Sequence, residues 1–244
     1  MRIPRLFLDR ILQLHTHLIL EEVESHRLST VLRLEKDHVV HVFNGDGFEY
    51  VASISIIKRR NIHLKITEKI AKDVESPLSI HLGQVISKGE KMDFVIQKAT
   101  ELGVKMITPL LSERCVVQVN QDRLEKKQDH WKKIAIHAAE QCGRTRLPII
   151  QAPMPLMEWV FNATEKHRLT LSLTATESLK KMSLSNNDSI AVLIGPEGGL
   201  TDTEVNFTTT KQFIPIQLGP RVLRTETAAL TILSLLQYQA GDLS

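Results

Sequence analysis

The stretch Ser189-Ile190-Ala191-Val192-Leu193-Ile194-Gly195-Pro196-Glu197-Gly198-Gly199 joins an apolar run directly to a glycine-rich turn. A second junction of the same kind follows, where Phe213-Ile214-Pro215-Ile216 leads to Leu218-Gly219-Pro220-Arg221. Each apolar run predicts a buried strand, and each turn predicts the approach to a helix. Ligand crevices in open α/β sheets form beyond the carboxyl ends of the strands. We therefore expect the two turns to form two walls of one crevice.

The residues before these junctions predict an α/β fold. Strand-like and helix-like segments alternate from residue 78 onward, which is typical of a mostly parallel sheet covered on both faces. The expected strands are residues 79–86, 104–110 and 169–174, and the expected helices are about 90–102 and 123–141.

The first third of the chain has a different pattern, rich in strands. Asn44-Gly45 between the apolar runs 39–43 and 48–54 predicts a hairpin. Residues 61–67 alternate like another half-buried strand, and a short helix is expected between 21 and 32. A small β-barrel fits this pattern better than a βαβ unit. The polar stretch that ends at Pro77 separates the two parts, so we expect domains at residues 1–72 and 73–244.

The charge distribution separates the same two parts. The net charge of +3 arises within residues 1–72, which hold 12 Lys and Arg against 9 Asp and Glu. A mildly basic module suits an RNA backbone, but a solvated surface explains the charge equally well. No apolar run is long enough for a membrane span, and the N-terminus lacks a secretory pattern. Two cysteines, Cys115 and Cys142, suit a reducing compartment, so we expect a soluble cytoplasmic protein.

The first glycine-rich turn excludes several ligand classes. It lacks the Gly-x-Gly-x-x-Gly pattern and the Gly-Lys-Ser/Thr ending of a phosphate loop. The carboxylate of Glu197 would repel a pyrophosphate and suits a neutral or cationic ligand. Thr201 and Glu204 fit a capping box, so a helix is expected to start there. A tight turn without a ligand is the alternative interpretation.

The second turn carries two charged residues at a helix start. Arg224 opposes the helix dipole, which costs some stability and suggests another purpose. The alternative is an ion pair between Arg224 and either Glu226 or Glu197. The histidines predict no metal site, because His38 and His41 lie three apart in a strand and the pair at 15 and 17 lacks a third partner.

Motifs along almost the whole chain resemble the RsmE family of RNA methyltransferases. The two glycine-rich turns carry the most specific part of the resemblance. Further matches are Arg2-Ile3-Pro4-Arg5-Leu6-Phe7, Lys88-Gly89-Glu90-Lys91-Met92-Asp93, residues 96–103, Glu113-Arg114, Ala139-Glu140-Gln141-Cys142-Gly143-Arg144 and Leu223-Arg224-Thr225-Glu226-Thr227-Ala228.

The resemblance implies a fold and an activity. It implies a C-terminal SPOUT domain with a deep trefoil knot, preceded by a PUA-like RNA-binding barrel, in a homodimer. It further implies methylation of uridine N3 in small-subunit (16S) ribosomal RNA, with S-adenosylmethionine as donor and no metal. The substrate would be ribosomal RNA or the small ribosomal subunit. Two alternatives stay open: another SPOUT enzyme that methylates ribose 2′-hydroxyls of transfer RNA, and a non-catalytic ribosome-assembly factor.

The two motif turns place Arg224 beside the expected ligand, so Arg224 would meet the uracil carbonyls or the RNA phosphate. Glu226 or Glu197 is the candidate proton acceptor, and the resemblance assigns the cofactor site. The residues expected to bind the cofactor are Leu173, Thr174, Ile194, Gly195, Pro196, Gly198, Gly199, Leu218, Gly219, Leu223, Arg224 and Thr225. From their charge alone, the arginines that could bind RNA phosphates are Arg2, Arg5, Arg10, Arg114, Arg144 and Arg146, although salt bridges would explain them as well.

Overall fold

A computed structural model describes residues 3–58, 61–115 and 121–243. The chain divides into two compact units. Unit 1 comprises Met1–Val74 and Ala139–Arg146, and unit 2 comprises Glu75–Ala138 and Leu147–Ser244. The domain bounds expected from the sequence, residues 1–72 and 73–244, stay a prediction. They place residues 139–146 in the second part, whereas unit 1 contains them.

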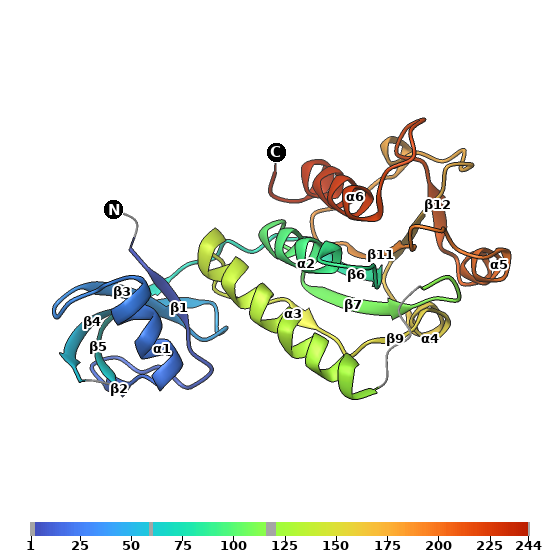
Figure 1. Cartoon of the computed structure of the whole chain (residues 1–244). Coiled ribbons are helices and arrows are strands. Elements are labelled where there is room, and N and C mark those ends of the chain that lie inside the picture. Colours follow the sequence, from blue (N-terminus) through green and yellow to red (C-terminus); the bar gives the residue numbers. More distant parts are fainter. Residues whose placement is uncertain (1–2, 59–60, 116–120, 244) are drawn as a thin grey trace. The chain divides into compact units, whose positions relative to one another are not determined.

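Unit 1 contains a five-stranded sheet with the order β1-β3-β4-β5-β2 (Figure 1). Its strands are β1 (Arg5–Phe7), β2 (His17–Ile19), β3 (Val39–Phe43), β4 (Phe48–Ile57) and β5 (Ile62–Ala71). The predicted hairpin is confirmed as the antiparallel pair β3–β4, and Gly45 in its turn has a φ of +92°. The expected helix is α1 (Glu22–His26), which continues as a π-helical turn, η1 (Arg27–Val31).

Unit 2 contains a seven-stranded sheet in which every strand pairing is parallel. The order is β12-β10-β11-β6-β7-β8, and β9 pairs with β7. The strands are β6 (Ser79–Val85), β7 (Met106–Leu111), β8 (Ile149–Ile150), β9 (Met154–Pro155), β10 (His167–Leu171), β11 (Ser189–Ile194) and β12 (Ile214–Ile216). The strand expected at 169–174 is corrected to β10, because residues 172–174 leave the sheet.

Both helices expected in the first half of unit 2 are present. They are α2 (Lys91–Glu101) and α3 (Gln121–Cys142). The remaining helical segments are α4 (Leu156–Asn162), η2 (Leu179–Lys181), α5 (Asp202–Thr210) and α6 (Thr225–Ala240). Within the described ranges, none of the helices combines the length and the apolar character that a membrane span requires.

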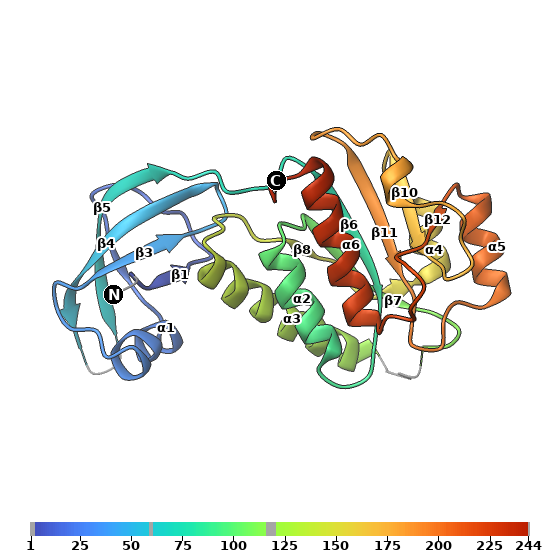
Figure 2. The ribbon, with the colours of Figure 1, turned by 90° about the horizontal axis from the view of Figure 1, so that it is seen from above.

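Side-chain alternation along β11 builds two cores, one on each face of the unit 2 sheet. Ile190, Val192 and Ile194 pack into the core that contains residues of α2, α3 and α6. Ala191 and Leu193 pack into the opposite core, which contains residues of α4. Figure 2 shows α2 and α6 side by side, with α4 and α5 at the far side of the strands. The sheet is therefore covered on both faces, as predicted. The trefoil knot stays a prediction.

Candidate active site

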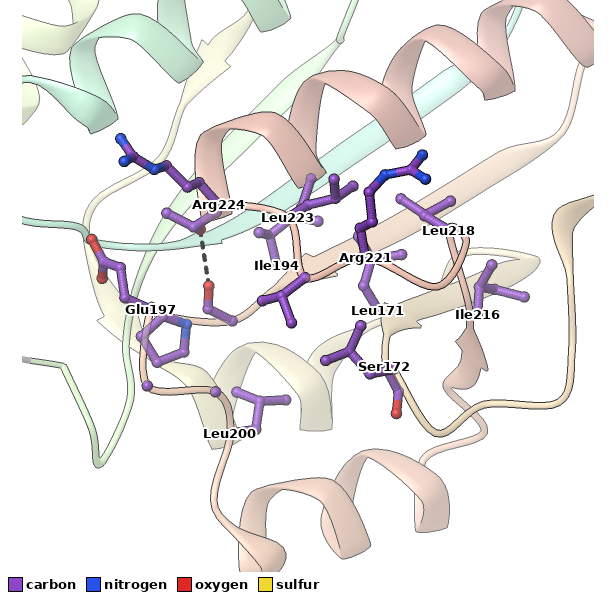
Figure 3. Close-up of a pocket in the computed structure, with 18 of the residues that line it drawn as sticks. Leu171, Ser172, Ile194, Glu197, Leu200, Ile216, Leu218, Arg221, Leu223 and Arg224 are labelled. Atoms are coloured by element: carbon purple, nitrogen blue, oxygen red, sulfur yellow. Dashed lines mark hydrogen bonds between the residues drawn. The ribbon is translucent and has the colours of Figure 1, made fainter.

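Both glycine-rich turns line a single cavity of about 480 Å³ in unit 2 (Figure 3). The cavity lies where β10, β11 and β12 end, at the carboxyl edge of the sheet. Residues from three segments line it: Leu171, Ser172, Leu173, Ile194, Gly195, Pro196, Glu197, Gly198, Gly199, Leu200, Ile216, Leu218, Gly219, Arg221, Val222, Leu223, Arg224, Thr225 and Ala228. A volume of this size is typical of small-molecule sites.

All but one of the residues predicted to bind the cofactor lie in this lining. Thr174 does not; it is exposed, and its backbone N–H is hydrogen-bonded to Ser172 Oγ at 3.3 Å. Other residues of the lining lie next to the predicted ones and were not predicted to bind the cofactor: Leu171, Ser172, Leu200, Ile216, Arg221, Val222 and Ala228. Leu171 and Ile216 end β10 and β12, so an accurate end for each strand would have identified them.

The loop of residues 195–200 is fixed at both of its ends. Thr225 Oγ1 donates a hydrogen bond to Gly195 O at 3.0 Å, which Figure 3 shows as a dashed line. After the loop, Glu204 Oε2 accepts from Thr201 N at 2.8 Å, and Glu204 N donates to Thr201 Oγ1 at 3.3 Å. This is the predicted capping box, and it starts α5. Gly199 has a φ of +70°, which favours glycine.

A buried glutamine connects the sheet to this loop. Gln84 is fully buried in β6, and its Nε2 donates to Thr225 Oγ1 at 2.9 Å and to Val85 O at 3.1 Å. The Thr225 hydroxyl in turn donates to Gly195 O, so hydrogen bonds link Gln84 to the loop. Gln84 Oε1 has no hydrogen-bond partner among the described residues. Gln84 was not predicted as a site residue, because a lone glutamine in a strand carries no local signal of its role.

The two candidate proton acceptors differ in their surroundings. Lys91 Nζ donates to Glu197 Oε1 at 2.8 Å and lies 3.9 Å from Glu226 Oε2. Burial alone would raise the pKa of Glu197, but the hydrogen bond from Lys91 and the charges of Lys91 and Lys88 outweigh it, so the pKa lies below its usual value. The hydrogen bond to Glu197 in turn raises the pKa of Lys91. Glu226 Oε2 is buried and lacks a hydrogen-bond partner within the described ranges.

Arg224 is exposed at the edge of the cavity. It is the N-cap of α6, and its side chain makes no capping hydrogen bond. In the part of the chain that the structure describes, it forms no ion pair with Glu197 or Glu226, since both of these lie near Lys91 instead. Figure 3 shows Arg224 and Glu197 at one end of the cavity and Ile216 and Leu218 at the other. The guanidinium of Arg224 is therefore free to contact a ligand at the edge of the cavity, whose walls are apolar side chains and glycines.

Two of the arginines predicted to bind RNA phosphates are buried in unit 1, which corrects the expectation for them. Arg5 is 9% exposed; its Nε donates to Glu49, and its terminal nitrogens donate to the carbonyls of Ala139, Glu140 and Arg144. Arg144 is 4% exposed. A phosphate has no access to either side chain without loss of the native packing.

The other predicted arginines have different surroundings. Arg10 donates to Glu24 at 2.7 Å and to Ile19 O at 2.9 Å. Arg114 donates to Gly198 O at 2.9 Å and to Leu200 O at 3.3 Å, so it holds the cavity loop. Arg146 is exposed beside Gly47. Arg2 lies outside the described residues.

Two of the histidines that the sequence analysis weighed as metal ligands, His38 and His41, have polar partners. His41 Nδ1 lies 3.0 Å from Glu49 Oε2, and His38 Nδ1 accepts from Glu35 N at 2.9 Å. Over residues 3–58, 61–115 and 121–243, no three side chains of His, Cys, Asp or Glu are placed to share a metal ion.

Comparison with protein families identifies both units. Residues 74–237 match the RNA methyltransferase domain family, and residues 28–67 match the RNA methyltransferase PUA domain family. The chain is 40% identical, over its whole length and 99% of the relative, to ribosomal RNA small subunit methyltransferase E of Buchnera aphidicola. The enzyme of the same name from Bacillus subtilis is 29% identical, over 88% of each chain.

Solved structures agree over the full length. A putative methyltransferase from Legionella pneumophila, in complex with the cofactor SAM, has a TM-score of 0.96 and 41% identity, and the match covers 100% of both chains. The ribosomal RNA small subunit methyltransferase E from Neisseria gonorrhoeae, bound to S-adenosyl methionine, has a TM-score of 0.92 and 32% identity, also over 100% of both chains.

Proposed function

The chain belongs to the family of ribosomal RNA small subunit methyltransferases E, and on this premise we propose that it transfers a methyl group from S-adenosylmethionine to N3 of a uridine in small-subunit ribosomal RNA. The observation that carries the proposal is the cavity at the carboxyl edge of the unit 2 sheet. Both family motifs wall it, and at its edge lies Arg224, exposed and without an ion-pair partner among the residues that the structure describes.

The lining fits this cofactor. Apolar side chains such as Ile194, Leu218 and Leu223 suit the faces of an adenine ring, and the glycine-rich turns offer backbone groups that a ligand can approach closely. Glu197 places a carboxylate in the lining, which suits a positively charged sulfonium and disfavours a pyrophosphate.

The reaction needs alignment, charge stabilisation and a proton acceptor. When bound, the cofactor supplies a methyl group whose bond to sulfur breaks as its bond to N3 forms, and the electron pair stays on sulfur. Arg224 stabilises negative charge on the uracil carbonyl oxygens. Glu226 accepts the N3 proton, because Glu197 is held as a weak base by Lys91.

The proposal extends to partners and location. The substrate is ribosomal RNA or the small subunit, and Arg10, Arg146 and Arg2 contact its phosphates. Two copies of the chain form a homodimer, for which the exposed Leu235 and Tyr238 of α6 offer apolar surface. A protein that acts on ribosomal RNA in this way works in the cytoplasm.

Methylation in vitro tests the proposal. Ribosomal RNA, small subunits and transfer RNA from cells that lack this protein are each incubated with the purified chain and a methyl-labelled cofactor, and the products are mapped by mass spectrometry. We expect one new 3-methyluridine. A 2′-O-methylated transfer RNA would favour the other SPOUT activity. Absence of cofactor heat in calorimetry, together with RNA binding, would favour the assembly factor.

A further inference from the structure

The loop of residues 195–200 contains three glycines, so ordering it costs more conformational entropy than ordering most loops. Its own hydrogen bonding is slight: Gly199 N donates to Pro196 O at 2.9 Å. Beyond Thr225 at its start, the loop is held by two cations from other parts of unit 2, Lys91 and Arg114. Neither residue lines the cavity.

Lys91 holds the middle of the loop. It is the first residue of α2, and its ammonium donates to Glu197, 106 positions further along the chain. The same ammonium lies 3.9 Å from Glu226 in the first turn of α6. One side chain thus connects α2 to both of the segments that carry the family motifs. The resemblance includes Lys91, but the sequence assigned it no role.

Arg114 holds the far end of the loop. A single terminal nitrogen donates to Gly198 O and to Leu200 O, which are the carbonyls on either side of Gly199. A Cβ built on Gly198 would lie 3.7 Å from Arg114 Cδ, so the stem of the arginine also packs on the loop. Hydrogen bonds from a charged donor to carbonyls are stronger than neutral ones.

We propose that Lys91 and Arg114 are positioning residues that hold the 195–200 loop in its cofactor-binding conformation before the cofactor arrives. The proposal rests on the proposed function, since it assumes that this cavity takes the cofactor. A loop that is already ordered loses less conformational freedom on binding, so the two cations increase affinity without contact with the ligand. Loss of either cation raises the KM for the cofactor. The kcat at saturation stays nearly unchanged on loss of Arg114, whose hydrogen bonds go to backbone carbonyls of the loop.

Calorimetric titration with S-adenosylmethionine tests the proposal. K91M is expected to weaken binding about threefold to fivefold, as for a partly exposed ion pair. R114M is expected to weaken it about tenfold, because two charge-assisted hydrogen bonds are lost. K91R restores binding to near the wild-type value. The matched control is K98M, because Lys98 lies on the same helix and pairs with Glu101 at 2.8 Å, away from the cavity lining; it binds like wild type.

Hydrogen exchange of the cofactor-free protein gives a second measurement. Exchange of the 195–200 amides is faster in K91M and R114M, whereas exchange of β11 is unchanged. Wild-type affinity in both variants, or an equal loss in K98M, would overturn the proposal. Faster exchange throughout unit 2 would overturn it as well. Neither assay uses RNA, so a wild-type protein that binds the cofactor without methylating RNA would refute the proposed function and leave this test intact.

Discussion

Arg5 in unit 1 and Arg224 in unit 2 show how differently the fold uses one residue type. Arg5 is 9% exposed, and every side-chain nitrogen donates to a group in unit 1. Arg224 is exposed and makes no ion pair with the described residues. From the sequence, both are arginines within family motifs. A charged side chain is therefore a candidate catalytic residue when the fold leaves it without an internal partner.

The largest effect is expected when Arg5, the buried arginine of unit 1, is replaced. Arg5→Met leaves Glu49 buried without its closest cation and removes a charged donor from three carbonyls. We expect unit 1 to lose about 3 kcal/mol of unfolding free energy. Native-state hydrogen exchange of β3 and β4 measures it. Arg146→Met, at an exposed site, is the control, and a loss for Arg5→Met as small as the control's would contradict the buried role.

The second largest effect is expected when Arg224, the exposed arginine of unit 2, is replaced. Arg224→Ala is expected to lower kcat about 100-fold, as for removal of one donor to a developing anion, which corresponds to about 2.7 kcal/mol. The free energy of unfolding should stay near that of wild type, because the Arg224 side chain is exposed and forms no ion pair with the residues that the structure describes. Turnover of labelled methyl groups into RNA is the measurement, with the exposed Lys180→Ala as control. Normal turnover would remove Arg224 from the mechanism.

A smaller effect is expected when Thr225, a buried residue at the start of α6 in unit 2, is replaced. Thr225→Val removes the hydroxyl between Gln84 and Gly195, so a buried amide and a carbonyl lose a partner. We expect unit 2 to lose about 1–2 kcal/mol. Urea unfolding followed by the fluorescence of Trp131 and Trp159 reports on unit 2. Thr227 lies exposed on the same helix, so Thr227→Val should lower the free energy of unfolding much less. Equal losses for the two variants would argue against a structural role for the hydrogen bonds that join Gln84, Thr225 and Gly195.

The smallest effect depends on pH. Burial would raise the pKa of Glu49, but hydrogen bonds from Arg5 and Lys72 lower it below its usual value. A depressed pKa adds stability above the unfolded-state pKa and loses it as the pH falls through the folded value. The free energy of unfolding of wild type should fall by at most about 0.4 kcal/mol through this group between pH 6 and pH 4.5. Urea unfolding of Glu49→Gln, followed by circular dichroism, should lack this increment; an identical pH slope would contradict the assignment.

Local signals predicted much of the fold. The Asn44-Gly45 turn, the capping box of Thr201 and Glu204, and the apolar run of β11 each depend on residues close in sequence, so their patterns were sufficient. The two glycine-rich turns predicted a shared crevice because parallel strands end at the same edge of a sheet.

Contacts between distant segments could not be predicted in this way. Lys91 and Glu197 are 106 positions apart, and Gln84 and Thr225 are 141 apart. Neither pair has a local pattern, because each depends on how helices pack across the finished sheet. The short α4 was missed for a similar reason: Trp159 contacts the site of Gly83, where a Cβ would lie 2.7 Å from the ring.

The order in which the chain is synthesised bears on unit 1, whose last piece is residues 139–146. Arg5 finds its carbonyl partners only on that piece, 134 or more positions downstream. A nascent chain that has emerged only as far as Val74 therefore carries the five strands and Glu49, but it lacks the three carbonyls that accept from the terminal nitrogens of Arg5. Unit 1 is therefore expected to complete its folding only after Arg146 has emerged from the ribosome, and a fragment cut at Val74 is expected to be less stable than unit 1.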